Sequence, residues 1–285
     1  MREGEGVTIR KRFLDMLIKR ASIRRLFELP EDRLYKVLQR RYREYDLPKY
    51  MYREFEVESE KNEKGRLFII RSRNTKPERG VLFLHGGGGM MSPTLFHFRL
   101  TARLARESGA ELWFPFYPLA PEYTSADSYE YAENVYHRIK QKFGAENLIM
   151  AGDSAGAGMT IGLCAADADK PRGLILISPP AGMKNKERLL DIESRDLMLS
   201  LRSIDIIKRS WTRGDKKSDA YTDALNADVA GFPPVLMYYG TEEMFCPGLR
   251  EFAQKLREND IQLETHEGNG MCHDWAIAGD RKSVV

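Results

Sequence analysis

From Val81 onward, short apolar runs alternate with longer segments that have helical periodicity. The runs cover residues 81–85, 111–117, 147–152, 173–178, 233–240 and 261–267, and the predicted helices cover residues 94–107, 128–143, 154–167 and 247–258. A strand that is apolar along its whole length is typical of a parallel sheet covered on both faces. The alternation therefore predicts the α/β fold class, with a mostly parallel central sheet and helices on both faces.

The residues before Val81 follow two other patterns. Apolar side chains recur at helical spacing over residues 8–27, and a second helix is expected over residues 29–45, in a region that Pro48 ends. From Arg53 to Ser59, apolar and polar residues alternate strictly, which predicts a half-exposed strand. We expect residues 65–72 to be its partner in a hairpin.

A second region interrupts the alternation of strands and helices. Residues 182–231 hold many charges and no clear apolar strand, and residues 189–211 are expected to be helical. This region is interpreted as an insertion outside the sheet. The expected division is therefore an N-terminal helical segment at 1–50, a core at 51–181 and 232–279, the insertion at 182–231 and a tail at 280–285.

Charge and composition exclude several classes of protein. The net charge of +3 combines +6 in residues 1–50 with −3 in the remainder. A solvated helix face explains the basic N-terminus better than contact with a membrane. No apolar run approaches the roughly 20 residues of a spanning helix, and no nucleic-acid motif is present. Because the N-terminus is charged throughout, we expect no secretory signal and a cytoplasmic protein.

Cysteine use indicates neither a disulfide framework nor a zinc site. The three cysteines are widely spaced and form no C-x-x-C motif. They are therefore expected to be reduced thiols, which are located at Cys164, Cys246 and Cys272.

The segment "LIMAGDSAGAG" predicts a nucleophile. Gly152 to Gly156 match G-x-S-x-G between an apolar strand and a helix, a context in which a sharp turn exposes the serine hydroxyl. Ser154 is the predicted nucleophile, and Asp153 belongs to the same motif. A phosphate site is the rival interpretation, but neither G-x-G-x-x-G nor a P-loop motif is present.

A serine nucleophile needs a base, and that base needs a partner. Hydrolases on such sheets place serine, acid and histidine in that order along the chain. His273, in the loop after the last strand, fits best, with His266 as the alternative. The acid is expected in the loop after the preceding strand, where Glu243 is favoured over Glu242. Adjacent side chains of an extended segment point in opposite directions, so only one faces the histidine.

The run "HGGGG" after the strand at 81–85 predicts a loop that holds an oxyanion. Backbone N–H groups approach a tetrahedral intermediate closely only where no Cβ intervenes. We expect the N–H groups of Gly87, Gly88 and Ala155 to form this oxyanion hole, with His85 and Gly86 supporting the loop. A linker is the wrong interpretation for a run that joins a buried strand to the next crossover of the sheet.

These motifs together resemble the hormone-sensitive-lipase-like branch of the α/β-hydrolases. The branch carries "HGGG", a "YPLAPE"-type segment and "GDSAG"; this chain has "HGGGG", "FYPLAPEYT" and "GDSAG" in that order. Its "GTEEMF" and "GMCHDW" are similar to the acid and histidine loops of bacterial esterases in the group. Gly89 stands where the family often has a bulkier residue, and the extra glycine is expected to widen the site or loosen the loop.

The resemblance implies hydrolysis of small carboxylic esters with short acyl chains, without cofactor or metal. It also implies that the N-terminal helices and the 182–231 insertion cap the site. Four residues near the motifs are candidates for the pocket, with core packing as the default: Met90, Met91, Tyr117 and Tyr123. Two alternatives stay open, a ligand-binding protein that has lost catalysis and an amidase or peptidase with the same triad.

The C-terminal residues differ from what the fold leads us to expect. Only 12 residues follow His273, too few for the helix that usually closes such folds. The final "DRKSVV" also back-translates into a nucleotide sequence that resembles a common sequencing-adapter oligonucleotide. We therefore expect a truncated chain in which Asp280 to Val285 are an artefact.

Overall fold

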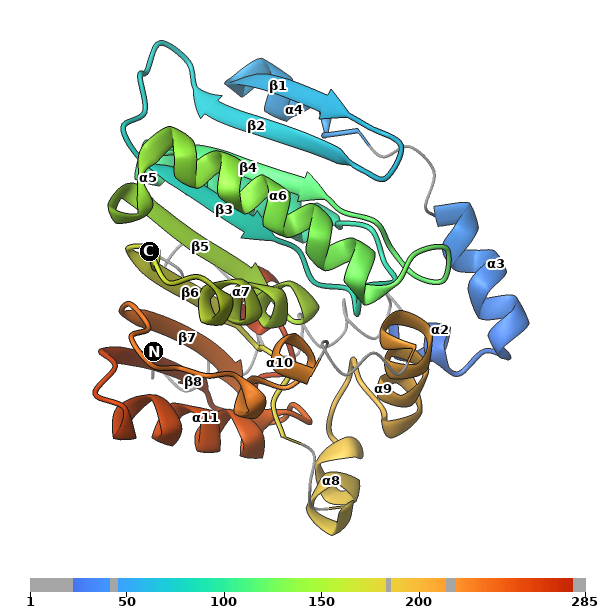
Figure 1. The fold of residues 1–285 in the computed structure, drawn as a ribbon. Coiled ribbons are helices and arrows are strands. Elements are labelled where there is room, and N and C mark those ends of the chain that lie inside the picture. The colour runs from blue at the N-terminus through green and yellow to red at the C-terminus, as the bar shows by residue number, and fades with distance from the viewer. Residues whose placement is uncertain (1–22, 42–45, 183–185, 214–218, 279–285) are drawn as a thin grey trace, which may run out of the picture.

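The computed structural model describes residues 23–41, 46–182, 186–213 and 219–278. Its centre is an eight-stranded sheet in the order β1-β2-β4-β3-β5-β6-β7-β8 (Figure 1). Strands β3 to β8 are parallel, whereas β2 pairs antiparallel with β1 and β4. The strands are β1 (Phe55–Lys61), β2 (Arg66–Ser72), β3 (Gly80–Leu84), β4 (Glu111–Phe116), β5 (Leu148–Asp153), β6 (Gly173–Ile177), β7 (Val235–Gly240) and β8 (Leu263–Gly268). The predicted α/β class is confirmed.

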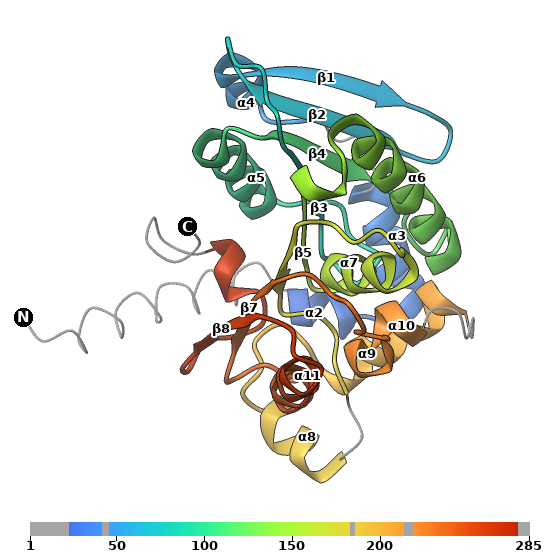
Figure 2. The ribbon, with the colours of Figure 1, turned by 60° about the vertical axis from the view of Figure 1, so that its left-hand side comes forward.

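Helices cover both faces of the sheet (Figure 2). One face packs against α6 (Ser125–Phe143), α7 (Ala155–Ala166) and α11 (Cys246–Glu258), and the other packs against α4 (Lys49–Glu54), α5 (Leu95–Ser108) and η5 (Trp275–Ala278). A hydrophobic core lies between each face of the sheet and its helices, and β3 supplies side chains to both cores. Leu82 and Leu84 face the first core, whereas Val81 and Phe83 face the second. This division follows from the two-residue period of a strand.

A cluster of helices lies beyond the carboxyl ends of the parallel strands (Figure 1). Its N-terminal part is α2 (Ile23–Phe27) and α3 (Glu31–Arg41). Its second part, from the 182–231 region, is α8 (Lys186–Glu193), α9 (Leu201–Ile207), the π-helical turn η2 (Lys208–Thr212), α10 (Asp219–Thr222) and the 3-10 turn η4 (Ala224–Asn226). We refer to these elements together as the cap. A further 3-10 turn, η1 (Ala145–Asn147), precedes β5.

Side chains join the two parts of the cap. The Tyr35 and Ser210 hydroxyls lie 2.7 Å apart, and the Arg209 guanidinium lies 3.0 Å from the Glu31 carboxylate. The Arg202 side chain donates to the Phe27 carbonyl at 3.2 Å. The N-terminal helices and the later region therefore lie together although some 150 residues separate them.

Two of the predicted elements have other boundaries in the structure. The hairpin predicted from residues 53–59 and 65–72 is confirmed, but β1 begins at Phe55 because α4, which follows Pro48, continues to Glu54. Alternation over a few residues does not exclude a helical turn. The predicted helix at 189–211 is interrupted between α8 and α9, where the Asp196 carboxylate and the Ser200 hydroxyl accept backbone hydrogen bonds. Such bonds compete with helical ones.

Three further predictions concern the two ends of the chain, membrane-spanning helices and the cysteines. Most of the predicted helix at 8–27 and the tail at 280–285 lie outside the described residues. Across the described residues, no helix combines the length and the apolar character that crossing a membrane requires. The three cysteines are free and buried, as predicted.

Gly156 provides a test of how closely α7 approaches the sheet. A Cβ at this position would lie 2.1 Å from the Leu84 carbonyl oxygen. Helix propensity favours Gly156→Ala by about 1 kcal/mol, whereas overpacking costs roughly 1–3 kcal/mol. We expect the overpacking to dominate, so that urea denaturation shows a lower free energy of unfolding for the variant.

Gly173→Ala is the matched control for this prediction. The added Cβ would lie 3.2 Å from Ile149 Cδ1, the flexible end of a side chain. We therefore expect a smaller loss of stability than in Gly156→Ala. Equal losses in the two variants would contradict the steric argument.

Candidate active site

Ser154 sits at the sharp turn between β5 and α7. Its φ of 48° and ψ of −122° are unusual for a residue with a side chain, and its N–H donates to the Ile177 carbonyl at 2.8 Å. The flanking glycines allow this turn. A Cβ on Gly152 would lie 2.7 Å from backbone atoms of Gly156, and one on Gly156 would meet the end of β3. The local sequence therefore places the serine at the carboxyl edge of the sheet.

Three side chains from separate loops form a hydrogen-bonded chain. His273, from the loop after β8, places Nε2 2.9 Å from Ser154 Oγ. Its Nδ1 lies 3.0 Å from Glu243 Oε2, in the loop after β7. Ser154 is 9% exposed, His273 2% and Glu243 0%. The arrangement is that of a nucleophile, a base and an orienting acid.

The two alternative residues have other partners. Glu242 donates its backbone N–H to the Met271 carbonyl at 3.0 Å, and its side chain is half-buried. His266 is exposed, contacts Glu264 at 2.8 Å and stacks on Tyr238. The structure therefore brings Glu243 and His273, of the four candidates, to Ser154.

Asp196, in the cap, holds the loop that carries Glu243. The Asp196 carboxylate is buried, and its Oδ2 accepts the Met244 N–H at 2.9 Å. Its Oδ1 accepts the N–H groups of Met198 and Leu199 at 2.8 and 2.9 Å. Sequence reasoning missed this residue, because an aspartate directly before a short apolar run signals only a turn.

The charges around the imidazole shift several pKa values. Burial raises the pKa of the Glu243 carboxyl, although hydrogen bonding to His273 opposes the rise. Burial by itself lowers the pKa of His273, but the Asp274 and Glu243 carboxylates outweigh it and raise the pKa to about 10. Asp274 is a second residue that sequence reasoning missed; its Oδ2 lies 3.3 Å from His273 Nε2.

The glycine loop after β3 lies against the serine. A Cβ on Gly86 would lie 3.0 Å from Ser154 Cβ and 2.2 Å from Asp153 Oδ2. Gly87 and Gly88 have φ values of 108° and 64°, which glycine adopts without strain. Within the described part of the chain, neither glycine's N–H donates a loop hydrogen bond. Ala155 is the first residue of α7, so its N–H is one of the helix's unpaired donors.

The fourth glycine does not widen the site, which was one of the two roles expected for it. A Cβ on Gly89 would lie 2.4 Å from the indole of Trp211, which is itself buried. The indole Nε1 donates to Ser128 Oγ at 3.0 Å, and the Gly89 carbonyl accepts the Ala120 N–H at 2.7 Å. Gly89 is therefore needed because the cap packs directly onto the loop.

Two buried histidines support this part of the sheet. His85 Nδ1 donates to the Gly86 carbonyl at 2.7 Å, and its ring stacks on Tyr117. Burial and the neighbouring His97 lower the pKa of His85 to about 3, so the ring is neutral. The Thr94 N–H donates to His97 Nδ1 at 2.9 Å; His97 Nε2 therefore carries the hydrogen that faces Asp153 Oδ2 at 3.0 Å.

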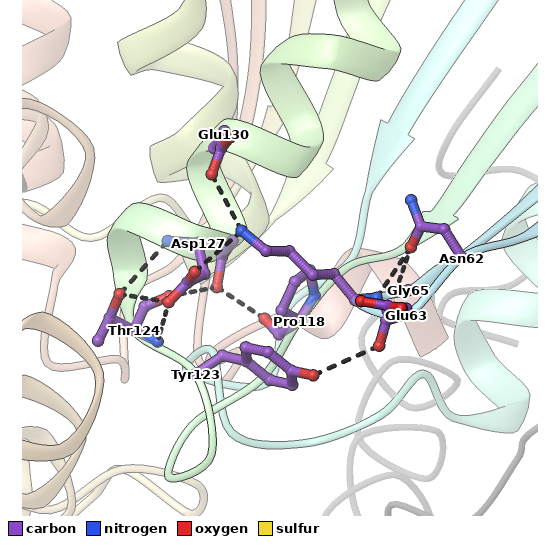
Figure 3. A network of polar contacts seen from close by, with 10 residues as sticks. Asn62, Glu63, Gly65, Pro118, Tyr123, Thr124, Asp127 and Glu130 are labelled. Atoms are coloured by element: carbon purple, nitrogen blue, oxygen red, sulfur yellow. Dashed lines mark hydrogen bonds and ion pairs between the residues drawn. The ribbon is translucent and has the colours of Figure 1, made fainter.

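The four pocket candidates pack within the fold. Met90 is buried in the first core, with Met91 half-buried against it. The buried Tyr117 hydroxyl donates to the His85 carbonyl. Tyr123 points toward the hairpin turn between β1 and β2, where its hydroxyl donates to the Glu63 carbonyl at 3.4 Å (Figure 3). Lys64 of the same turn lies 3.2 Å from both Asp127 and Glu130 of α6.

The site's chemistry lies in side chains and backbone N–H groups. At the positions that the structure describes, no group of three or more His, Cys, Asp or Glu residues is arranged to hold a metal ion. The buried histidines instead contact carboxylates, hydroxyls and backbone groups. The arrangement can activate a serine hydroxyl by transferring its proton to His273.

Comparisons with known proteins agree with this geometry. Residues 81–277 match the model of the alpha/beta hydrolase fold family. An esterase of Acinetobacter venetianus is 26% identical over 74% of this chain and 74% of its own length. An acetyl-hydrolase of Streptomyces hygroscopicus is 25% identical over 69% of this chain and 68% of its own length.

Comparison with a solved structure indicates the same fold. A hormone-sensitive lipase from a metagenome library superposes with a TM-score of 0.76 at 21% identity, covering 94% of this chain and 91% of its own. The family match alone covers more than half of the chain. The chain therefore belongs to the α/β hydrolase fold family, as its motifs predicted.

Proposed function

We propose that this protein is a serine hydrolase that cleaves carboxylic esters with short acyl chains through an acyl-enzyme on Ser154. The hydrogen-bonded chain from Ser154 through His273 to Glu243 carries the proposal, with contacts of 2.9 and 3.0 Å. A protein that only binds a ligand has no need for these three side chains in one line. The esterase and acetyl-hydrolase relatives, and the resemblance to the hormone-sensitive-lipase-like branch, support an ester as the substrate.

The proposed reaction begins with proton transfer. His273 Nε2 takes the proton from Ser154 Oγ as the oxygen attacks the ester carbonyl, and the imidazolium then returns the proton to the leaving alcohol. Glu243 holds Nδ1–H and stabilises the imidazolium. Water attacks the acyl-enzyme in the second half of the reaction, again with His273 as base. No cofactor takes part in either step.

The tetrahedral intermediates need donors for the oxyanion. We assign this role to the backbone N–H groups of Gly87 and Gly88, in the loop whose Gly86 lies against Ser154, and of Ala155, the first residue of α7. Losing one donor of this kind costs roughly 3–4 kcal/mol of transition-state stabilisation. The contacts described above hold the glycine loop after β3 against the turn that carries Ser154. They involve His85, Gly86 and Asp153.

The cap supports a small acyl pocket. A Cβ on Gly88 would lie 2.7 Å from Ile207 of α9, so this side chain is next to one proposed donor for the substrate carbonyl. Trp211 fills the space beside Gly89. Residues 1–50 and 182–231 act, in this proposal, as two parts of one cap on the core.

The first prediction concerns the nucleophile. Ser154→Ala should lower kcat for p-nitrophenyl butyrate by about 10⁴–10⁶-fold, because the acyl-enzyme cannot form. A fluorophosphonate probe should label the wild-type protein and not the variant. Ser108→Ala, on the exposed end of α5, should behave as wild type in both assays.

The outcomes of this experiment separate the three hypotheses. Equal hydrolysis by wild type and Ser154→Ala would overturn the nucleophile assignment. A wild-type protein that neither hydrolyses esters nor reacts with the probe would indicate a ligand-binding protein. Faster cleavage of matched amides than of esters would favour an amidase.

The second prediction distinguishes the adjacent glutamates. Glu243→Gln should lower kcat by about 10⁴-fold, because the neutral amide no longer stabilises the imidazolium or fixes its tautomer. Glu242→Gln should stay within about twofold of wild type. Steady-state kinetics measure both variants, and thermal melting checks that each is folded. The opposite ranking of the two variants would assign the acid to Glu242.

The third prediction concerns acyl-chain length. In a series of p-nitrophenyl esters, kcat/KM should peak at acetate or butyrate and fall for longer chains. Ile207→Ala should shift the peak toward longer chains, because it enlarges the space next to Gly88. Leu201→Ala, at the other end of α9, is the control and should keep the wild-type preference. A wild-type maximum at long chains would contradict a small pocket.

A further inference from the structure

A second carboxylate lies beside the catalytic imidazole. Asp274 Oδ2 is 3.3 Å from His273 Nε2, the nitrogen that also contacts Ser154 Oγ at 2.9 Å. The Asp274 side chain is 7% exposed, and its Oδ1 has no hydrogen-bond partner in the described part of the chain. The triad mechanism assigns no role to this group.

The backbone holds Asp274 in this position. Its φ of 56° lies in the left-handed region, which asparagine and aspartate enter more readily than most residues. Its N–H donates to Ser178 Oγ at 3.1 Å, and its carbonyl accepts the Ile277 N–H at 3.1 Å. Ser178 itself lies directly after β6 with a φ of 44°. Such backbone conformations cost free energy and cluster at functional sites.

A buried carboxylate without a counter-charge is strongly disfavoured. The charged and titratable groups that act on Asp274 come from four places: His273 beside it, Glu243 after β7, Asp153 at the end of β5 and Asp196 in the cap. Three of these are carboxyl groups. His273 is thus the one group among them that can supply a positive charge, and it does so only as an imidazolium.

We propose that Asp274 is a second charge partner of His273, which stabilises the imidazolium formed during catalysis and sets the pH above which His273 acts as a base. Glu243 holds Nδ1 from one side of the ring, and Asp274 acts on Nε2 from the other. The catalytic part of this inference rests on the proposed function, whereas the contact between the two side chains does not.

The pKa values of Asp274 and His273 depend on each other. Burial raises the pKa of Asp274 well above its usual value, the His273 charge opposes the rise, and the other three carboxyl groups add to it. The charge of Asp274 is the largest single contribution that raises the pKa of His273, and Glu243 raises it through both a hydrogen bond and its charge. Because an imidazolium cannot accept the Ser154 proton, activity should fall as pH falls below the His273 pKa. Removing the Asp274 charge should lower that pKa.

Asp274→Asn tests the proposal directly. Asparagine keeps the size of the side chain and tolerates the left-handed backbone, so the substitution removes mainly the charge. The acid limb of kcat/KM for p-nitrophenyl butyrate should move to lower pH by about one unit or more, which is a tenfold change in the fraction of neutral imidazole. A limb that coincides with the wild-type limb would overturn the proposal and leave Asp274 a structural role.

Asp260→Asn is the matched control. Asp260 has a φ of 58° but is exposed, in the turn between α11 and β8. This substitution changes an aspartate in the same backbone conformation without changing the charge beside His273. Its pH profile should match that of the wild type, and an equal shift in both variants would show that net charge alone causes the effect.

A second measurement does not depend on catalysis. The downfield imidazole N–H signals in the proton NMR spectrum of the wild-type protein report the protonation of His273. These signals should titrate about two units or more above the ordinary histidine pKa of about 6.5. Titration near that ordinary value would overturn the pairing with Asp274. If the protein hydrolyses no ester while the signals titrate as expected and move to lower pH in Asp274→Asn, the proposed function fails and the pairing of His273 with Asp274 stands.

Discussion

The close approach of α7 to the sheet is the constraint on which the rest of the site depends. Gly156 lets the first turn of the helix meet the carbonyl end of β3, and Gly152 lets β5 turn into the helix without a clash. This turn leaves Ser154 at the carboxyl edge with a φ that places its hydroxyl toward the loops. The loops after β7 and β8 start at the same edge of the sheet because these strands are parallel. Ser154, Glu243 and His273 can therefore meet.

The cap acts on this edge through packing and hydrogen bonds. Trp211 packs against Gly89, and Ile207 packs against Gly88. These contacts hold the loop that we assign to the oxyanion next to the serine. Asp196 reaches the acid loop through the Met244 N–H. These contacts come from a region that supplies no strand to the described sheet. In our proposal, the helices that limit the substrate also hold the catalytic groups in place.

Burial gives the site its electrostatic character. Glu243, Asp274 and His273 are each less than 10% exposed, and interactions between charges are stronger in such a setting than in water. Each carboxylate is disfavoured by burial but favours a positive charge on the imidazole. The balance between these effects decides when His273 is neutral and able to take a proton, and it depends on all three groups together.

Sequence alone determined the features that arise from local physical chemistry. The alternation of apolar runs and helical segments predicted the sheet, and the glycines around Ser154 predicted the turn, because backbone sterics and periodic burial act over a few residues. Chain order pointed to His273 and to the loop with Glu242 and Glu243. Only the tertiary structure decided that Glu243 contacts the imidazole, that Trp211 explains Gly89, and that Asp196 and Asp274 belong to the site. These contacts join residues that are far apart in the chain or depend on the direction of a single side chain, and packing of the whole fold sets both.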